Sequence, residues 1–203
     1  MMNISGILLA AGMSTRMGQP KQLLPFGHST VIDTVIDTLM ASQLVEVMVV
    51  LGHQRQQIYQ QIEPKLTGQR LRIVDNPDYR AGMLTSVQVA LEQISPSSPA
   101  FALMLVDQPL ITAGTINQVL EAHRSTTMPI TIPQYRSRRG HPAIFDSQFI
   151  AEISALGWES RGMKEILDRH REQIHYLPVE TDSILRDMDT PQDYQRLLKA
   201  STR

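Results

Sequence analysis

Short apolar runs alternate along the chain with longer segments in which apolar residues recur every three or four positions. The first run, Ile4–Ala11, is continuous and ends at a glycine, which is typical of a β-strand buried on both faces of a sheet. The segment His28–Ser42 has the apolar spacing of an amphipathic helix. The same reasoning predicts strands at Glu46–Leu51, Leu71–Asp75, Phe101–Val106, Ile130–Pro133, His141–Phe145 and Ile174–Val179, and helices at Gln54–Ile62, Gly82–Ile94, Thr112–Arg124, Ser147–Leu156, Gly162–Arg171 and Thr190–Leu198.

This alternation of buried strands and helices predicts an α/β fold. Strands that are apolar on both faces need helices above and below, so we expect a mostly parallel sheet in a three-layer arrangement. The two short strands around the polar segment Ser137–Gly140 can add an antiparallel piece. No repeat and no linker divides the 203 residues, so we expect one domain over residues 1–203.

The composition removes several classes of function. A net charge of −1 provides no field that would attract nucleic acid or a membrane surface. The absence of cysteine excludes disulfides, thiolate metal sites and a cysteine nucleophile. No stretch approaches the ~20 apolar residues of a membrane helix, and the first apolar run is too short for the core of a signal peptide. We therefore expect a cytoplasmic protein without a nucleic-acid or membrane partner.

The loop after the first strand is the first candidate site, because ligands of such sheets bind beyond the carboxyl ends of the strands. Its small residues let backbone N–H groups approach an anion, and Arg16 and Lys21 add charge where a polyphosphate would extend. Five residues separate Gly12 from Gly18, and Gln-Pro intervenes before Lys21, which excludes a Walker A loop; a G-x-G-x-x-G fingerprint is also absent. A plain turn with two solvated cations is the alternative interpretation.

Acidic residues follow two other predicted strands. Asp107 ends an apolar strand, where it could hold Mg²⁺ on a bound triphosphate or merely begin a turn. Asp187 and Asp189 precede the last helix, and either could complete a metal site opposite Asp107. The alternative is that they favour the helix dipole, next to a pair, Thr190 and Asp193, that resembles a capping box.

These features together would form one site for a triphosphate and Mg²⁺, and their sequence context resembles a known family. LLAAGMSTRMGQPKQLLPFG resembles the signature L-A-[AG]-G-x-S-x-R-[MF]-G-x-x-K-x-L-L-P of nucleotidyltransferases related to the molybdenum cofactor enzymes. NPDYRAGMLTSV, LMLVDQP, RGHPAIF and DMDTPQDY agree in the same order, from Ile4 to Tyr194. The paired alanines before Gly12 look like the cytidylyltransferase branch, since the guanylyltransferase branch more often has Leu-Ala-Gly-Gly. The implied fold is a Rossmann-like three-layer α/β/α nucleotidyltransferase fold.

The resemblance implies Mg²⁺-dependent transfer of CMP from CTP to the phosphate of a molybdopterin-type cofactor, with release of pyrophosphate and with a molybdoenzyme as a possible recipient of the product. Arg16 would neutralise the leaving pyrophosphate and Lys21 the α-phosphate, while Asp107 and Asp189 would hold Mg²⁺, with Asp187 as a substitute. The implied nucleotide-binding residues are Leu9, Ala10, Ala11, Gly12, Arg16, Lys21, Gly82, Met83 and Ser86. The last three would lie by the base or ribose; alternatively, Met83 is a core residue and Ser86 an ordinary residue of a first helical turn.

The acceptor is less defined. Arg138, Arg139 and His141 lie in the polar segment between two short strands, where they could receive an anionic acceptor or simply form a solvated loop. The branch commonly has a G-D-x-G-A-R-like segment where this chain has GWESRGMK, Gly157–Lys164, so the second substrate stays open. A sugar-phosphate acceptor, GTP as donor, or a non-catalytic factor that binds and delivers the cofactor are the alternatives. The set of Arg16, Lys21 and Asp107 argues against the non-catalytic factor, which needs no triphosphate site.

Overall fold

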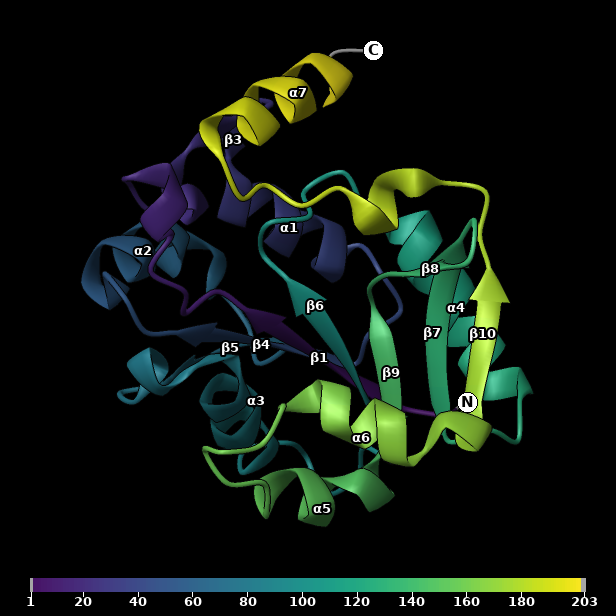
Figure 1. Ribbon diagram of the computed structural model, residues 1–203. Helices are drawn as coiled ribbons and strands as arrows, with labels where there is room; N and C mark the ends of the chain where they lie inside the picture. Colours follow the sequence, from purple (N-terminus) through teal and green to yellow (C-terminus); the bar gives the residue numbers. More distant parts are fainter. Residues whose placement is uncertain (1, 202–203) are drawn as a thin grey trace.

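The apolar runs form an eight-stranded sheet in the computed structural model, which describes residues 2–201 (Figure 1). The strand order is β10-β7-β9-β6-β1-β4-β5, with the short β8 paired to β7. β9 runs antiparallel to β6 and β7, whereas β1 is parallel to both of its neighbours. The strands are β1 (Ile4–Leu9), β4 (Glu46–Leu51), β5 (Leu71–Asp75), β6 (Ala100–Leu105), β7 (Ile130–Tyr135), β8 (Arg138–Arg139), β9 (Ala143–Asp146) and β10 (Ile174–Pro178), and β2 (Pro25–Phe26) and β3 (Ser29–Thr30) form a separate hairpin.

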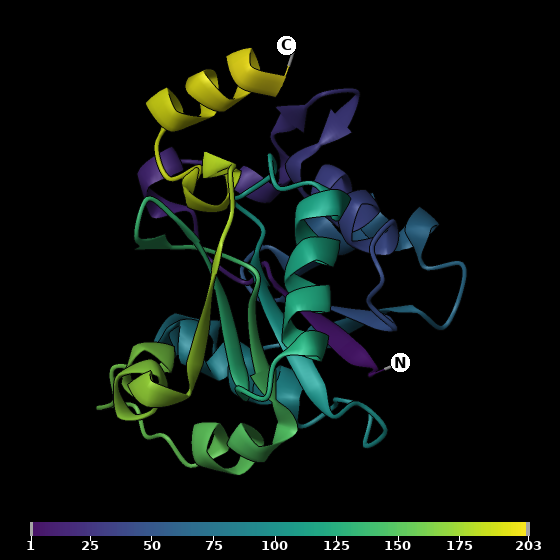
Figure 2. The same ribbon diagram turned by 90° about the vertical axis from the view of Figure 1, so that its right-hand side faces the viewer.

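Helices cover both faces of this sheet, as Figure 2 shows from the side. Alternate residues of β1 point to opposite faces: Ile4 and Leu8 pack in one core, Ile7 and Leu9 in the other. The first core includes residues of α1, α2 and α4, and the second includes residues of α3, α5 and α6, which confirms the three-layer α/β/α fold. The helices are α1 (Val31–Met40), α2 (Arg55–Ile62), α3 (Met83–Leu91), α4 (Ala113–Ser125), α5 (Ile150–Ser154), α6 (Met163–Arg169) and α7 (Pro191–Ser201). None of these helices is long and apolar enough to cross a membrane.

Several segments differ from the sequence prediction. The strand expected from His141 begins at Ala143, and the helix expected from Ser147 begins with a 3-10 turn, so that α5 starts at Ile150. The helix expected from His28 begins only at Val31, because the β2–β3 hairpin takes the preceding residues and turns at Gly27, whose φ is 60°. The Thr30 side chain accepts a hydrogen bond from the Asp33 amide and so caps α1. Arg138 and Arg139, expected in a loop, form strand β8 against the end of β7.

Candidate active site

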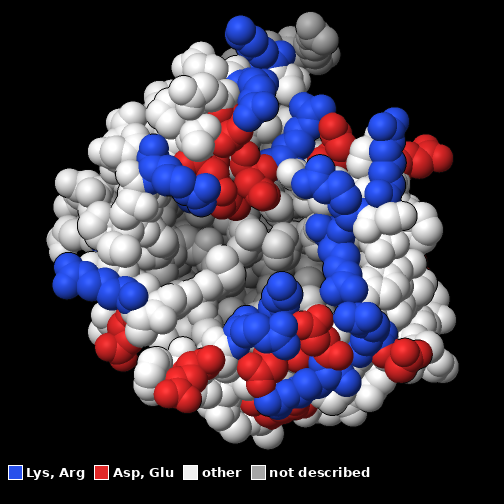
Figure 3. Space-filling model, in the orientation of Figure 1, with Lys and Arg blue, Asp and Glu red and all other residues white. Residues whose placement is uncertain are grey.

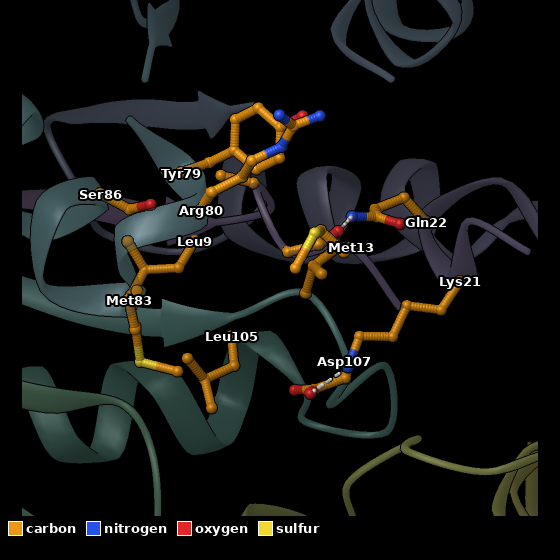
Figure 4. A pocket seen from close by; sticks show the side chains of 14 residues that line it. Leu9, Met13, Lys21, Gln22, Tyr79, Arg80, Met83, Ser86, Leu105 and Asp107 are labelled. Atoms are coloured by element: carbon orange, nitrogen blue, oxygen red, sulfur yellow. Dashed lines mark hydrogen bonds and ion pairs between the residues drawn. The ribbon is translucent and has the colours of Figure 1, made fainter. Parts of the chain in front are cut away.

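A pocket of about 310 Å³ opens where β1 and β6 end (Figure 4). The loop after β1, the start of α3 and the end of β6 each contribute a wall. In Figure 4, Lys21 and Asp107 point toward one another at one side of the pocket, and Met83 and Leu105 lie at the other. Of the residues expected to bind nucleotide, Leu9, Ala11, Gly12, Lys21, Gly82, Met83 and Ser86 line the pocket.

The loop after β1 is held in place by a residue that the sequence analysis missed. Gln22 is 1% exposed, and its Nε2 donates hydrogen bonds to the carbonyl oxygens of Ala10 at 2.7 Å and Gly12 at 3.1 Å. The hydroxyl of Ser14 accepts a further hydrogen bond from the Lys21 amide at 3.2 Å. These contacts fix the bend that brings Lys21 back to the strand ends. The available signal was a polar residue directly after Lys21, at the start of an apolar stretch.

Of the paired alanines Ala10 and Ala11, only Ala11 lines the pocket. The side chain of Ala10 is 1% exposed and packs in the core beneath the sheet. Ala10 can therefore contribute to a ligand through its backbone alone, and the methyl group that would contact a base belongs to Ala11.

Lys21 joins two acidic residues that lie far apart in the sequence. Its Nζ is 2.6 Å from Oδ2 of Asp107 and 3.4 Å from Oδ1 of Asp189. Arg16, which is not among the residues that line the pocket, pairs with the same Asp189 carboxylate at 2.9 Å and has 68% of its own side chain exposed. Figure 3 shows acidic side chains gathered at one edge of a central hollow, with basic side chains beside them. The positions expected to neutralise a triphosphate and to hold a cation thus meet at one place.

The donor set fits a divalent cation on a bound phosphate. The side chain of Asp107 is 14% exposed, and its Oδ1 is buried without a hydrogen-bond partner, so one carboxylate oxygen is available as a ligand. No group of three acidic or histidine side chains within residues 2–201 is arranged to hold a metal. Magnesium prefers one or two carboxylates completed by phosphate oxygens and water, which matches the Asp107–Asp189 pair and not a metal cage made by the protein alone.

The capping box that the sequence suggested at Thr190 and Asp193 is present at the start of α7. Helix α7 is capped by Thr190 and Asp193: the Thr190 amide donates to Oδ2 of Asp193 at 2.9 Å, and the Asp193 amide donates to the Thr190 hydroxyl at 3.2 Å. These capping hydrogen bonds involve only Thr190 and Asp193, whereas Asp187 accepts a hydrogen bond from Gln108 and Asp189 pairs with Lys21 and Arg16.

Asp187 lies beside the nucleotide pocket and not in it. Its Oδ1 accepts a hydrogen bond from Nε2 of Gln108 at 2.7 Å, and its side chain lines a separate cavity next to α7. Partial burial raises the pKa of Asp187, and the negative charges of Asp107 and Asp189 raise it further, against the opposing effects of Gln108 and Lys21. This places Asp187 close enough to interact with the Asp107–Asp189 pair, although only Asp189 shares Lys21 with Asp107.

The raised pKa of Asp187 predicts that ionisation of this carboxyl lowers the free energy of unfolding as the pH rises. A carboxyl whose pKa is raised on folding stabilises the protein below its unfolded pKa, and this contribution is lost as the pH rises through the folded value. Asp187→Asn should therefore raise the midpoint of thermal unfolding near neutral pH by about 1–2 °C, a small effect because the side chain is exposed to screening solvent. The gain should disappear near pH ~3, where the carboxyl is protonated in both states.

The control for this melting experiment is Asp182→Asn, which removes an acid that pairs with Arg186 at 2.7 Å and has 45% of its side chain exposed. It should give no gain at either pH. A gain for Asp187→Asn that persisted unchanged in acid would contradict the electrostatic origin.

The start of α3 forms the wall opposite Asp107. Gly82 has a φ of 119°, which only glycine adopts without strain, and this bend starts the helix at Met83. Met83 is 59% exposed, which contradicts its alternative interpretation as a core residue. Ser86 is 4% exposed and accepts a hydrogen bond from Nδ2 of Asn76 at 2.8 Å. Tyr79 and Arg80, which also line the pocket, lie in the quoted NPDYRAGM segment but were not singled out.

The residues expected at the acceptor lie on the other side of Asp107. Burial lowers the pKa of His141, opposed by the nearby Asp107 carboxylate, and the Nδ1 atom of His141 is buried without a hydrogen-bond partner. Arg139 lies over the ring of Tyr176, 5.1 Å from its centre. Neither Arg138 nor Arg139 forms an ion pair within the described part of the chain. In Figure 3 a column of basic side chains borders the right-hand side of the hollow.

A small-residue loop after the first strand, facing carboxylates across a pocket at the strand ends, defines a nucleotide-binding α/β protein. Residues 6–174 match the MobA-like NTP transferase domain, and the chain belongs to that family. Membership of this family indicates a transferase.

Two relatives align with almost the whole chain. One is the nicotine blue oxidoreductase of Paenarthrobacter nicotinovorans, 29% identical over an alignment of 205 positions that covers 96% of this chain and 96% of the relative. The other is the molybdenum cofactor cytidylyltransferase of Escherichia coli K12, 25% identical over 94% of this chain and 93% of the relative.

The solved structure of Rv0371c from Mycobacterium tuberculosis H37Rv has a TM-score of 0.84 at 29% identity and covers 98% of both chains. The same protein has been solved in complex with manganese, with a TM-score of 0.79, 27% identity and 98% coverage of both chains. The fold therefore accommodates a divalent cation in a protein similar to this one.

Proposed function

We propose that this protein is a Mg²⁺-dependent cytidylyltransferase that transfers CMP from CTP to the phosphate of a molybdopterin-type cofactor. The observation that carries the proposal is the position of Lys21, whose Nζ lies between Asp107 and Asp189 at the mouth of the pocket formed by Ala11, Gly12 and the start of α3. Family membership and the cytidylyltransferase relative support the reaction class.

In the proposed reaction an oxygen of the acceptor phosphate bonds to the α-phosphorus of CTP, and the bond between that phosphorus and the β-phosphate oxygen breaks. Pyrophosphate leaves with the electron pair. Such transfers need positioning and charge neutralisation more than covalent help. Mg²⁺ held by Asp107 and Asp189 would supply charge neutralisation at the phosphates. Lys21 would stabilise charge at the α-phosphate, and the exposed Arg16 would face the leaving pyrophosphate.

The preference for CTP rests on Ala11. Its methyl group lines the pocket, where a glycine would leave more space beside the base, so a pyrimidine is favoured over a purine. Ser86 and the backbone of Gly82 and Met83 would contact the base or ribose from α3.

The acceptor phosphate would bind on the β8 side of Asp107. Arg138 and Arg139 carry positive charge and have no acidic partner among the described residues. His141 lies close enough to Asp107 for the negative charge of that carboxylate to raise the pKa of the imidazole, against the larger effect of burial. A lowered pKa keeps the His141 imidazole neutral at physiological pH, so it would act as a hydrogen-bonding group and not as a fixed cation.

The oxidoreductase relative supports a second candidate function, because it matches 96% of the chain at 29% identity, slightly more than the 25% of the cytidylyltransferase. An oxidoreductase needs an electron donor, such as a nicotinamide dinucleotide. The loop after β1 lacks the G-x-G-x-x-G pattern that binds such dinucleotides, which favours the transferase.

A ligand panel separates the candidates. We expect CTP with Mg²⁺ to raise the apparent stability by about 2–4 kcal/mol at saturating excess, as followed by thermal unfolding, and GTP, ATP, UTP, NADH and NADPH to raise it less. Purified protein with CTP and molybdopterin cofactor should then release pyrophosphate. Preference for GTP would overturn the choice of donor, and stabilisation by NADH or NADPH alone would favour the oxidoreductase.

A further inference from the structure

A second cavity, of about 390 Å³, lies between the start of α3 and the segment that joins α5 to α6. Its volume is within the range of small-molecule sites. The walls are largely apolar and come from Met83, Leu84, Leu156 and Met163. Thioether side chains adapt to the shape of a flat ligand and make favourable contacts with aromatic rings.

An exposed aromatic side chain stands at this cavity. Trp158, the chain's one tryptophan, is 86% exposed and is among the lining residues. An indole that is exposed to solvent at the edge of an apolar cavity is available to stack on a planar ring.

The cavity also holds a cation without a partner. Arg161 is neutralised by Asp168 at 2.9 Å, whereas Lys164 forms no ion pair within residues 2–201. Lys164 is exposed and lies one residue into α6, so its ammonium can meet an anionic group of a bound ligand. Apolar walls, an indole face and one free cation together describe the complement of a flat ligand with a negative charge.

The second cavity adjoins the nucleotide pocket. Gly82 and Met83 line both, and Figure 4 shows the Met83 side chain reaching from α3 toward Leu105, across the side of the nucleotide pocket that is away from Lys21. Since Leu105 and Asp107 lie on the same strand end, a ligand in the second cavity can extend past Met83 toward the reacting phosphates.

We propose that this cavity binds the planar fused-ring heterocycle of the acceptor, with the ring stacked on Trp158 and an anionic substituent at Lys164. The identity of the ligand as an acceptor rests on the proposed function; the binding of a flat anionic heterocycle does not. Met83 then separates the donor base from the acceptor ring.

The test uses the tryptophan as its own reporter. Pterin-6-carboxylate, a flat fused heterocycle with a carboxylate, is titrated into the full-length protein while Trp158 emission is recorded. We expect saturable quenching, and about tenfold weaker binding for Lys164→Ala. For Trp158→Ala, which has no tryptophan emission, binding is followed by the anisotropy of pterin fluorescence and should also weaken about tenfold. Arg171→Ala, which removes an exposed cation outside the cavity, should bind as the wild type does.

The outcomes are separable from those of the proposed function. Absence of saturable quenching, equal affinity in all variants, or displacement of the probe by CTP would overturn this proposal, the last because it would place the probe in the nucleotide pocket. A concentration-dependent blue shift of Trp158 emission without probe would also overturn it, by placing a second copy of the chain there. If no nucleoside triphosphate stabilises the protein while the Lys164 and Trp158 variants still lose the probe, the proposed function fails and the heterocycle site stands.

Discussion

Asp107→Asn should lower the rate of CMP transfer by about a thousandfold while the protein remains folded. Asparagine keeps the shape of the side chain and can still accept the hydrogen bond that Nζ of Lys21 donates to Asp107 over 2.6 Å. The substitution removes the negative charge that would hold Mg²⁺ against the triphosphate, a contribution of several kcal/mol to the transition state, and each 1.4 kcal/mol corresponds to about tenfold in rate. Lys21 retains Asp189 as a partner, so folding is little affected.

The measurement is pyrophosphate release from CTP with Mg²⁺ and the acceptor, next to thermal unfolding of the same preparations. Asp75→Asn is the matched control. Asp75 also forms an ion pair, with Arg55 at 2.7 Å, but its side chain is 54% exposed and does not line the pocket. It should retain full activity. Wild-type turnover by the Asp107 variant would remove this residue from the metal site and would leave the proposed mechanism without its main carboxylate.

Two neighbouring parallel strands could be predicted from the sequence, because a short apolar run is a local pattern that can be read without knowing the rest of the fold. β4 and β5 have the predicted ends, since each is a short apolar run closed by a polar or glycine residue. The start of α1 could not be predicted, because the residues before it pair as a hairpin that depends on the turn at Gly27. The direction of β9 in the sheet is likewise set by its distant neighbours, β6 and β7.

The part of the site that could be predicted from the sequence is the part formed by residues that follow parallel strands. The rule that strand ends meet at one edge of a parallel sheet brings Lys21 and Asp107 together, because both follow parallel neighbours, β1 and β6. Asp189 follows no strand directly, and its approach to Lys21 depends on the path of the chain before α7. Gln22 and Trp158 could not be predicted either, because the sequence does not show that Gln22 is buried or that Trp158 is exposed.

Lys21→Met should have two effects of opposite sign. Turnover should fall by about two to three orders of magnitude, because the charge that would stabilise the α-phosphate is lost. Affinity for Mn²⁺ in the absence of nucleotide should rise by about tenfold, because Nζ of Lys21 lies 2.6 Å from Asp107 and 3.4 Å from Asp189 and neutralises both carboxylates that would attract the cation. On this proposal Lys21 would weaken metal binding in the free protein, where it pairs with both carboxylates. It would stop doing so when a nucleotide phosphate takes their place as its partner.

The free Mn²⁺ signal in electron paramagnetic resonance measures this affinity without any turnover. Arg16→Met is the matched control, because Arg16 also pairs with Asp189, at 2.9 Å, but with 68% of its side chain exposed to screening solvent; its effect on Mn²⁺ should be smaller. Loss of Lys21 also leaves the Asp107 carboxylate, 14% exposed, without its cation, so the variant should lose about 3 kcal/mol of stability and regain part of it with Mn²⁺. Unchanged or weaker Mn²⁺ binding would show that Lys21 does not compete with the cation, and nucleotide and metal would then bind independently.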